Sequence, residues 1–274
     1  MKKALITVLC SITLFSCASS GVNAGGGESG AQDNGKSGWA LYSEGLYYKN
    51  LAMTATDPAE KIRNFDRAID LLERARDSVE DSGRIYYHLA EIYYYKGESK
   101  KALENAELSV SIEKDFYPPY ERMYTIRMER KEYQEAADVL ERYLQVDPEN
   151  LNTLYSLGLH YYKYMNDSKR SLEKFSRITR YYRTTGLSPE YAENAWYVSG
   201  YIYFTMNEYK KSFKCYKNVY ALNNNNMNAV SMLAVTAMSE YNIKEAEKYA
   251  QLYLESNPGE LNMQYILGLV YYIN

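Results

Sequence analysis

The sequence has few of the residues that build metal sites, disulfides and active sites. Its 274 residues include two histidines and three cysteines. His88 and His160 lie far apart, and neither belongs to a spacing of His, Cys and Asp that is typical of a metal site. A glycine-rich phosphate loop and a nucleophile elbow are also absent from the sequence. The sequence therefore predicts a protein that is not an enzyme and that uses no metal or other cofactor.

Proline and strand-like runs are scarce as well, and positive charge is not in excess. There are six prolines, and the formal net charge of -3 gives no electrostatic basis for binding nucleic acid. Tyrosine is abundant instead, with 32 residues against six phenylalanines and two tryptophans. From Trp39 onward, Ala, Leu, Glu, Lys and Tyr recur at helical spacing. We therefore expect an all-α protein.

The N-terminus has the features of a secretory signal. Two lysines precede an apolar stretch, residues 4–15, that is shorter than the roughly 20 residues a membrane-spanning helix needs. Its length matches the apolar core of a signal peptide. The stretch runs into Leu14-Phe15-Ser16-Cys17, which resembles the lipobox of bacterial lipoproteins, although Phe15 stands where that motif has a small residue. An ordinary cleavable signal is the alternative interpretation.

The lipobox resemblance implies a lipid-anchored protein. Residues 1–16 would be removed and Cys17 would carry fatty acyl chains, several of which together hold a protein stably at a membrane. Cys17 is not followed by the Asp that retains some lipoproteins at the inner membrane, which favours an outer-membrane location facing the periplasm. With Cys10 removed and Cys17 acylated, Cys215 has no cysteine left to pair with.

A low-complexity segment separates this signal from the rest of the chain. Residues 17–37 are rich in Gly, Ser and small polar residues and contain no aromatic residue. Such a segment has too little apolar surface to fold, so we expect a flexible tether. We expect the folded body to span residues 38–274.

The body repeats with a period of about 34 residues. One unit contains Trp196-x-x-Ser199-Gly200-x-x-Tyr203, and another contains Leu154-x-x-Leu157-Gly158-x-x-Tyr161. After a first unit that starts near Leu41, the unit starts lie near Gly83, Tyr117, Leu151, Glu193, Met227 and Leu261. This pattern resembles the tetratricopeptide-repeat (TPR) family, in which each unit is a pair of helices. The resemblance implies a superhelical solenoid of about six helix pairs plus a final single helix.

Two interruptions and two prolines mark expected boundaries. Extra residues at 54–61 are expected to lengthen the turn inside the first unit. An eight-residue excess before the unit at Glu193 is expected to form a loop at 184–189. Pro148 and Pro258 are expected just beyond the ends of second helices.

Small residues recur at the eighth and twentieth positions of the units, as at Ala90, Gly158, Gly200 and Ala246. They are expected to let the two helices of a pair approach closely. A larger side chain there would overpack the crossing, at a cost of about 1–3 kcal/mol.

In TPR proteins, the first helices of the pairs line a concave groove that binds a partner. Carried over by position, the groove residues are Trp39, Tyr42, Tyr87, Glu91, Tyr94, Tyr95, Tyr155, Leu159, Tyr162, Tyr197, Tyr201, Phe204, Tyr265 and Tyr272. A tyrosine-rich surface suits a protein or peptide ligand with apolar side chains. The alternative is that these rings only pack or face solvent. Arg122 alone fits a clamp for a terminal carboxylate, so that mode of binding is not expected.

Three further features have structural interpretations. Asparagines at the second position of four units are expected to cap first helices rather than to clamp a ligand; they are Asn152, Asn194, Asn228 and Asn262. Two basic rows on second helices are expected to face solvent; they are Lys174, Arg177, Arg180 and Arg183, and Lys210, Lys211, Lys214 and Lys217. Cys215 is expected to be a buried, unreactive residue.

These observations together predict a non-catalytic, lipid-anchored scaffold that binds protein or peptide partners in assembly of a bacterial envelope. The layout is similar to that of the TPR lipoprotein of the outer-membrane barrel-assembly machinery and to the pilotin lipoproteins of type IV pili. A surface-exposed lipoprotein that binds extracellular or host ligands is one alternative, and a non-catalytic accessory to a cell-wall enzyme is another. The final helix, at 262–274, is apolar, and we expect that a partner covers it, that a second copy of the chain covers it, or that the sequence ends early.

Overall fold

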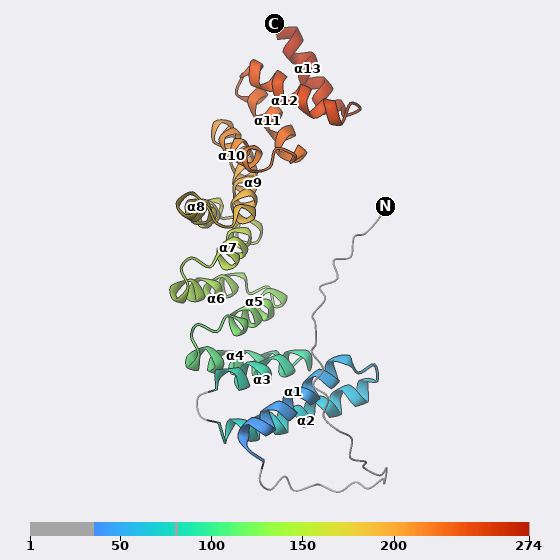
Figure 1. Ribbon diagram of the computed structural model, residues 1–274, viewed down its shortest axis with the longest axis vertical. Helices are drawn as coiled ribbons and strands as arrows, with labels where there is room; N and C mark the ends of the chain where they lie inside the picture. Colours follow the sequence, from blue (N-terminus) through green and yellow to red (C-terminus); the bar gives the residue numbers. More distant parts are fainter. Residues whose placement is uncertain (1–35, 80–81, 274) are drawn as a thin grey trace. The chain divides into compact units, whose positions relative to one another are not determined.

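The computed structural model describes residues 36–79 and 82–273, and these residues form helices and no strands (Figure 1). The predicted signal peptide, Cys17 and nearly all of the predicted tether lie outside the described residues. The helices are α1 (Gly38–Thr54), α2 (Pro58–Arg76), α3 (Gly83–Tyr95), α4 (Ser99–Ile112), α5 (Pro118–Glu129), α6 (Tyr133–Val146), α7 (Leu151–Lys163), α8 (Ser168–Thr185), α9 (Pro189–Thr205), α10 (Tyr209–Leu222), α11 (Met227–Ser239), α12 (Ile243–Ser256) and α13 (Leu261–Ile273).

The helices of the body, residues 37–274, pack as consecutive pairs. Within each pair the two helices pack against each other most extensively, and the second helix of each pair also contacts the first helix of the next (Figure 1). The pairs begin with α1 and α2 and end with α11 and α12, while α13 packs on both α12 and α11. This arrangement confirms the predicted all-α fold of six helix pairs plus a final single helix.

First helices also touch one another across unit boundaries. Contacts of this kind join α1 to α3, α3 to α5, α7 to α9, and α11 to α13. We call the exposed sides of α1, α3, α5, α7, α9, α11 and α13 the first-helix face. Side chains from neighbouring units can therefore meet on this face.

Close approach of paired helices depends on glycine at the crossing. A Cβ added to Gly158 would lie 2.8 Å from the ring of Phe175, and one added to Gly200 would lie 2.9 Å from the ring of Tyr216. Ser171 and Ser212 are buried, and their hydroxyls donate hydrogen bonds of 2.7 Å to the carbonyls of Gly158 and Gly200. The structure thus confirms that the small residues allow close packing.

The extra residues of the first unit lie in its helices and not in its turn. α1 has 17 residues and α2 has 19, whereas α3 and α4 have 13 and 14. The prediction of a long turn at 54–61 is therefore wrong. The reason is the strong helix start at Asp57, whose carboxylate accepts from the backbone N–H groups of Ala59 and Glu60, with Pro58 as the first helical residue.

The eight-residue excess before α9 is also taken up mostly by helix. α8 has 18 residues and α9 has 17, and only residues 186–188 separate them. Gly186 has a φ of 72°, which glycine adopts without the steric cost of a side chain, and it ends α8. The predicted loop is present but short, and the predicted unit start at Glu193 lies one turn inside α9. Pro148 and Pro258 follow the ends of α6 and α12, as predicted.

The predicted asparagine caps are displaced by two residues. Asn150 caps α7 and Asn226 caps α11, through side-chain oxygens that accept from the backbone N–H groups three residues later. Asn152, Asn228 and Asn262 lie inside the first turns of α7, α11 and α13, and Asn194 lies within α9. Their predicted role as caps is therefore wrong, because a cap must stand before the first helical residue.

Candidate functional site

The predicted groove residues lie on first helices and form separate groups. Tyr42, Tyr87, Glu91 and Tyr94, with Trp39 and Tyr95, lie on α1 and α3. Tyr155, Leu159, Tyr162, Tyr197 and Tyr201 lie on α7 and α9, and Phe204 stands near the end of α9 against Tyr209. Tyr265 and Tyr272 lie on α13, where their exposed fractions are 68% and 88%.

Charged side chains link the first three first helices. Lys49 on α1 contacts Glu91 on α3 at 2.6 Å between Nζ and Oε2, and Arg122 on α5 contacts the other carboxylate oxygen at 3.3 Å. His88 Nδ1 lies 3.3 Å from Glu91 Oε2. We call Lys49, His88, Glu91 and Arg122 the Glu91 cluster; all four are largely buried.

The Glu91 carboxylate is paired within the Glu91 cluster, with a cation at each of its two oxygens. Burial alone would raise the pKa of Glu91, but hydrogen bonds from His88 and Lys49 and the Lys49 charge outweigh it and lower the pKa to about 2. Arg122 also stacks on the ring of Tyr94, with 4.4 Å from its guanidinium carbon to the ring centroid. Glu91 and Arg122 are thus occupied within the protein, and the cluster joins units rather than offering free charges to a partner.

A second group forms a pocket between α7 and α9. We call it the α7–α9 pocket; it has a volume of about 370 Å³ and is lined by Tyr155, Leu159, Tyr162, Lys163, Tyr197, Val198 and Tyr201. Five of these residues are predicted groove residues. Sequence reasoning missed Val198 and Lys163, although Lys163 stands at the thirteenth position of its unit, which the family pattern places on the groove.

Packing beneath the α7–α9 pocket holds its rings in place. The ring centroids of Tyr155 and Phe175 are 5.7 Å apart, and those of Tyr197 and Tyr216 are 5.6 Å apart. Phe175 and Tyr216 are the same rings that press against Gly158 and Gly200. The small residues at the helix crossings therefore bring up the second-helix rings that support the pocket from below.

The α7–α9 pocket combines apolar walls with free polar groups. Lys163 is its only charged lining residue, and no carboxylate in the described part of the chain pairs with it. The hydroxyls of Tyr155, Tyr162, Tyr197 and Tyr201 form no hydrogen bond with another described residue. Burial raises the pKa of Tyr155, so its hydroxyl stays protonated and can donate. Such a pocket can bind a side chain of a ligand and can form hydrogen bonds with polar groups of the ligand next to that side chain.

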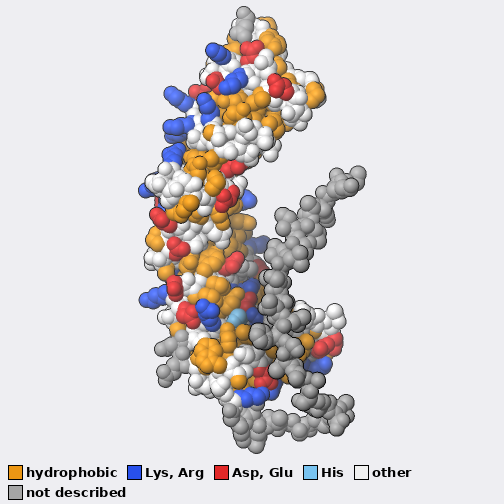
Figure 2. All heavy atoms as spheres, viewed as in Figure 1, with side chains coloured by type: hydrophobic (Ala, Val, Ile, Leu, Met, Phe, Trp, Pro, Cys, Tyr) orange, Lys and Arg blue, Asp and Glu red, His pale blue; other side chains and the backbone are white. Residues whose placement is uncertain are grey.

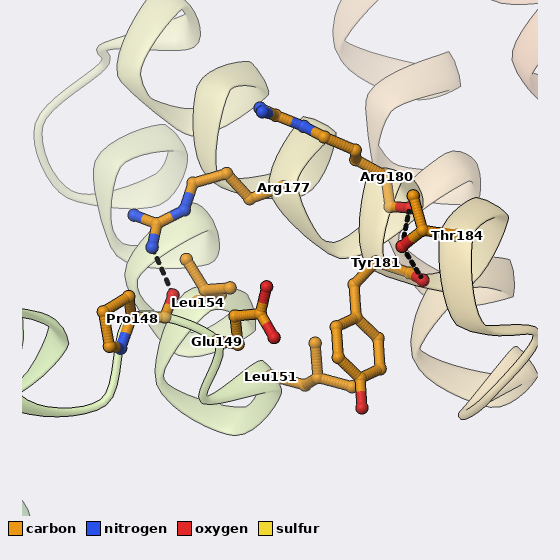
Figure 3. A pocket seen from close by; sticks show the side chains of 8 residues that line it. All are labelled: Pro148, Glu149, Leu151, Leu154, Arg177, Arg180, Tyr181 and Thr184. Atoms are coloured by element: carbon orange, nitrogen blue, oxygen red, sulfur yellow. Dashed lines mark hydrogen bonds between the residues drawn. The ribbon is translucent and has the colours of Figure 1, made fainter.

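The first basic row, on α8, is a solvated face only in part. Lys174 is buried and pairs with Glu141 at 2.7 Å, and the Arg183 guanidinium lies over the Trp196 ring at 5.4 Å. Arg177 donates to the carbonyl of Pro148 at one wall of a pocket of about 460 Å³, and Arg180 also lines that pocket (Figure 3). Lys174 and Arg177 thus pack between units, contrary to the prediction, while Arg180 and Arg183 are exposed to solvent as predicted.

The second basic row, on α10, is exposed as predicted. Its members Lys210, Lys211, Lys214 and Lys217 all face solvent. Figure 2 shows basic side chains standing out along the edge of the molecule near α10.

His160 and Cys215, two other side chains that could react, lie in packed surroundings in the described part of the chain. His160 is buried, with Nε2 2.9 Å from the Tyr133 carbonyl and Nδ1 3.2 Å from the Tyr124 hydroxyl. Burial raises the pKa of Cys215 to about 11, so its thiol stays protonated at neutral pH. Residues 36–79 and 82–273 contain no group of three or more His, Cys, Asp and Glu that could hold a metal ion. No helix in those ranges has the length and apolar character to cross a membrane.

Known proteins resemble the chain in sequence and in fold. The tetratricopeptide repeat model matches residues 59–115. A TPR repeat-containing protein of Methanocaldococcus jannaschii is 19% identical over 201 residues, which cover 73% of this chain and 34% of that protein. The chain thus spans about a third of the length of this relative.

Two solved structures share the fold. The MamA protein is 15% identical and has a TM-score of 0.51, with 67% of this chain and 96% of that chain covered. The TPR protein YrrB, described as having an unusual peptide-binding site, is 16% identical and has a TM-score of 0.52, with 71% and 96% covered. Residues 59–115 thus match the tetratricopeptide repeat in sequence, and the described residues share the fold of TPR solenoids, with six helix pairs and a final helix.

Proposed function

We propose that the protein is a non-catalytic adaptor that binds protein or peptide partners on its first-helix face, with the α7–α9 pocket as the main contact. The pocket carries this proposal, because it joins four tyrosine rings and Leu159 into one apolar hollow whose hydroxyls have no partner among the described residues. Large aromatic surfaces with a polar tip are enriched where proteins bind one another. The Glu91 cluster is a weaker candidate because its charges already pair with one another.

Likeness to YrrB supports a peptide as the bound species. That protein has the same fold and is described as having a peptide-binding site. A helix-pair repeat presents its first helices side by side, so an extended or helical segment can cross several units.

Photocrosslinking tests the location of the contact. A photoreactive phenylalanine analogue at Tyr201, which is 48% exposed, should capture partner proteins in cells. The same analogue at Tyr241, which lies in the turn after α11 and is 82% exposed, serves as the matched control. Capture at 201 that disappears in a Tyr197→Ala background supports the proposal. Equal capture at both positions, or capture unaffected by Tyr197→Ala, would place the binding surface elsewhere.

We further propose that acylation of Cys17 anchors this adaptor in a bacterial envelope, at the periplasmic side of the outer membrane, where it serves assembly of envelope structures. The lipobox-like sequence before Cys17 and the Gly/Ser-rich segment after it support this proposal. Radioactive fatty acid should label the unaltered chain and leave Cys17→Ala unlabelled, and label retained by Cys17→Ala would refute the anchor.

Protease added to intact cells tests the side of the membrane. Protection of the body until the outer membrane is opened supports the periplasmic location. Digestion in intact cells would contradict it and would favour the alternative of a surface protein that binds extracellular or host ligands.

A further inference from the structure

We infer that the α7–α9 pocket takes one bulky aliphatic or aromatic side chain from an extended peptide, and that an acidic residue of the same peptide pairs with Lys163. This inference rests on the proposed function and specifies the chemistry of the partner. It follows from three features of the pocket: its apolar lining and size, its unpaired hydroxyls, and its single charge.

The lining and the size favour an apolar anchor. The walls are tyrosine rings, Leu159 and Val198, and the underlying contacts are to the rings of Phe175 and Tyr216. A charged or strongly polar side chain at the bottom would lose its water without gaining a hydrogen bond there. The volume of about 370 Å³ lies near the lower end of the roughly 300–1,000 Å³ range of ligand pockets, which fits a single large side chain.

The free hydroxyls favour an extended peptide over a helix. Those of Tyr155, Tyr162, Tyr197 and Tyr201 bond to no other described residue, while other tyrosine hydroxyls are paired, such as that of Tyr161 with Glu141 at 2.8 Å. The backbone N–H and C=O groups of a helix are already satisfied within it, except at its ends. An extended peptide keeps these groups free and can bond to hydroxyls on either side of its anchor.

The charge of the pocket favours an acidic residue next to the anchor. Lys163 at the end of α7 is exposed, and no described carboxylate neutralises it. Among other cations near predicted groove residues, Lys49 and Arg122 are held by Glu91, and Arg84 on α3 pairs with Glu113. A carboxylate on the partner therefore finds its counterpart at Lys163, and this pair fixes the direction in which the peptide crosses the pocket.

Selection from random twelve-residue peptides displayed on phage tests the inference on the full chain. Selected sequences should share a Leu, Ile, Met, Phe or Trp with an Asp or Glu at a fixed distance from it. The synthetic peptide should bind Tyr201→Ala at least tenfold more weakly. Tyr201 is half exposed, so this variant should keep its fold, which circular dichroism verifies. Tyr47→Ala, at a 62% exposed tyrosine of α1, is the matched control and should bind like the unaltered protein.

A charge swap tests the role of Lys163. Lys163→Glu should weaken binding about tenfold, Lys163→Arg should preserve it, and replacing the acidic residue of the peptide by Lys should restore binding to Lys163→Glu. Peptides that bind Tyr201→Ala unchanged, or failure to select any peptide, would overturn the proposed function together with this inference. Binding that depends on Tyr201 but uses a polar anchor, or that ignores Lys163→Glu, would overturn the inference alone.

Discussion

Tyrosine side chains serve three different purposes in this chain, and the state of the hydroxyl distinguishes them. Tyr216 fills the space above Gly200, is fully buried, and has a hydroxyl without a hydrogen-bond partner. Tyr161 is equally buried, but its hydroxyl donates to Glu141. Tyr201 leaves its ring and its hydroxyl accessible. The repeat pattern predicts which rings lie on which helix, but the partner of each hydroxyl depends on contacts between helices.

Removal of the Tyr216 hydroxyl should stabilise the protein. A buried polar group without a partner costs about 1–3 kcal/mol, so Tyr216→Phe should raise the free energy of unfolding by about 1 kcal/mol. Tyr161→Phe is the matched control and should lower it by about 1 kcal/mol, because it removes a real hydrogen bond. Urea denaturation of both variants checks this. A loss of stability in Tyr216→Phe equal to that in Tyr161→Phe would mean that the hydroxyl of Tyr216 is satisfied.

Alanine at two of the helical glycines, Gly200 and Gly268, should have opposite effects. A Cβ at Gly200 would meet the Tyr216 ring at 2.9 Å, so Gly200→Ala should lower the free energy of unfolding by about 1–3 kcal/mol through overpacking. A Cβ at Gly268 has no described atom within 4 Å, so Gly268→Ala should raise it by about 0.5–1 kcal/mol through better helix propensity. Thermal unfolding compares the two. Similar losses in both variants would contradict the assignment of Gly200 as a contact glycine.

At the scale of helices, the sequence predicts most boundaries but misplaces the insertions. The helix starts at Gly83 and Leu151, and again those at Met227 and Leu261, follow the 34-residue period, because each unit repeats one pattern of apolar positions. The insertions in the first unit and before α9 were expected to form loops, yet they lengthen the flanking helices by about one turn or more. A period can show that residues are added, but local capping at Asp57 and Gly186 decides where each helix stops.

A buried ion pair that joins three helices gives a test at this scale. Lys174 on α8, 6% exposed, contacts Glu141 on α6, which also accepts from Tyr161 on α7. Glu141→Ala should lower the free energy of unfolding by about 2 kcal/mol, less than for a fully buried pair because Glu141 is 33% exposed. Glu141→Leu combined with Lys174→Met and Tyr161→Phe, which removes the hydroxyl that would lose its acceptor, should recover most of this loss, as urea denaturation can show. A triple variant as unstable as Glu141→Ala would mean that the paired groups themselves, and not the polar groups left behind, determine the effect.

At the scale of the molecule, units with the same repeat pattern carry two different kinds of surface. One is the apolar α7–α9 pocket, and the other is the Glu91 cluster of paired charges. Position in the repeat was enough to place Tyr155, Leu159, Tyr162, Tyr197 and Tyr201 on the first-helix face, where they line one pocket. It was not enough to show that Glu91 is occupied, since its partners Lys49 and Arg122 come from other units, 42 and 31 residues away. Pairings of this length leave no periodic signal in a single sequence.

Acid should destabilise the body, because the pKa values of His88, His160 and Glu91 all shift in the direction that acid penalises. Burial lowers the pKa of His88 and of His160 below 6.5, so the unfolded chain binds more protons than the native one as pH falls below that value. Glu91 has a pKa of about 2 against an ordinary 4.5, so its stabilising contribution, about 3 kcal/mol, is lost as pH falls from 4.5 toward 2.

Urea denaturation at pH 7.5, 5.5 and 3.5 should therefore give a free energy of unfolding that falls at each step. The double variant His88→Gln and His160→Gln has no histidine to titrate, because these are the only two in the chain. Its free energy of unfolding should be flat between pH 7.5 and 5.5 and should still fall below pH 4.5, since Glu91 remains. A variant that keeps the full slope above pH 5.5 would show that groups other than the buried imidazoles set the response of the repeat stack to mild acid.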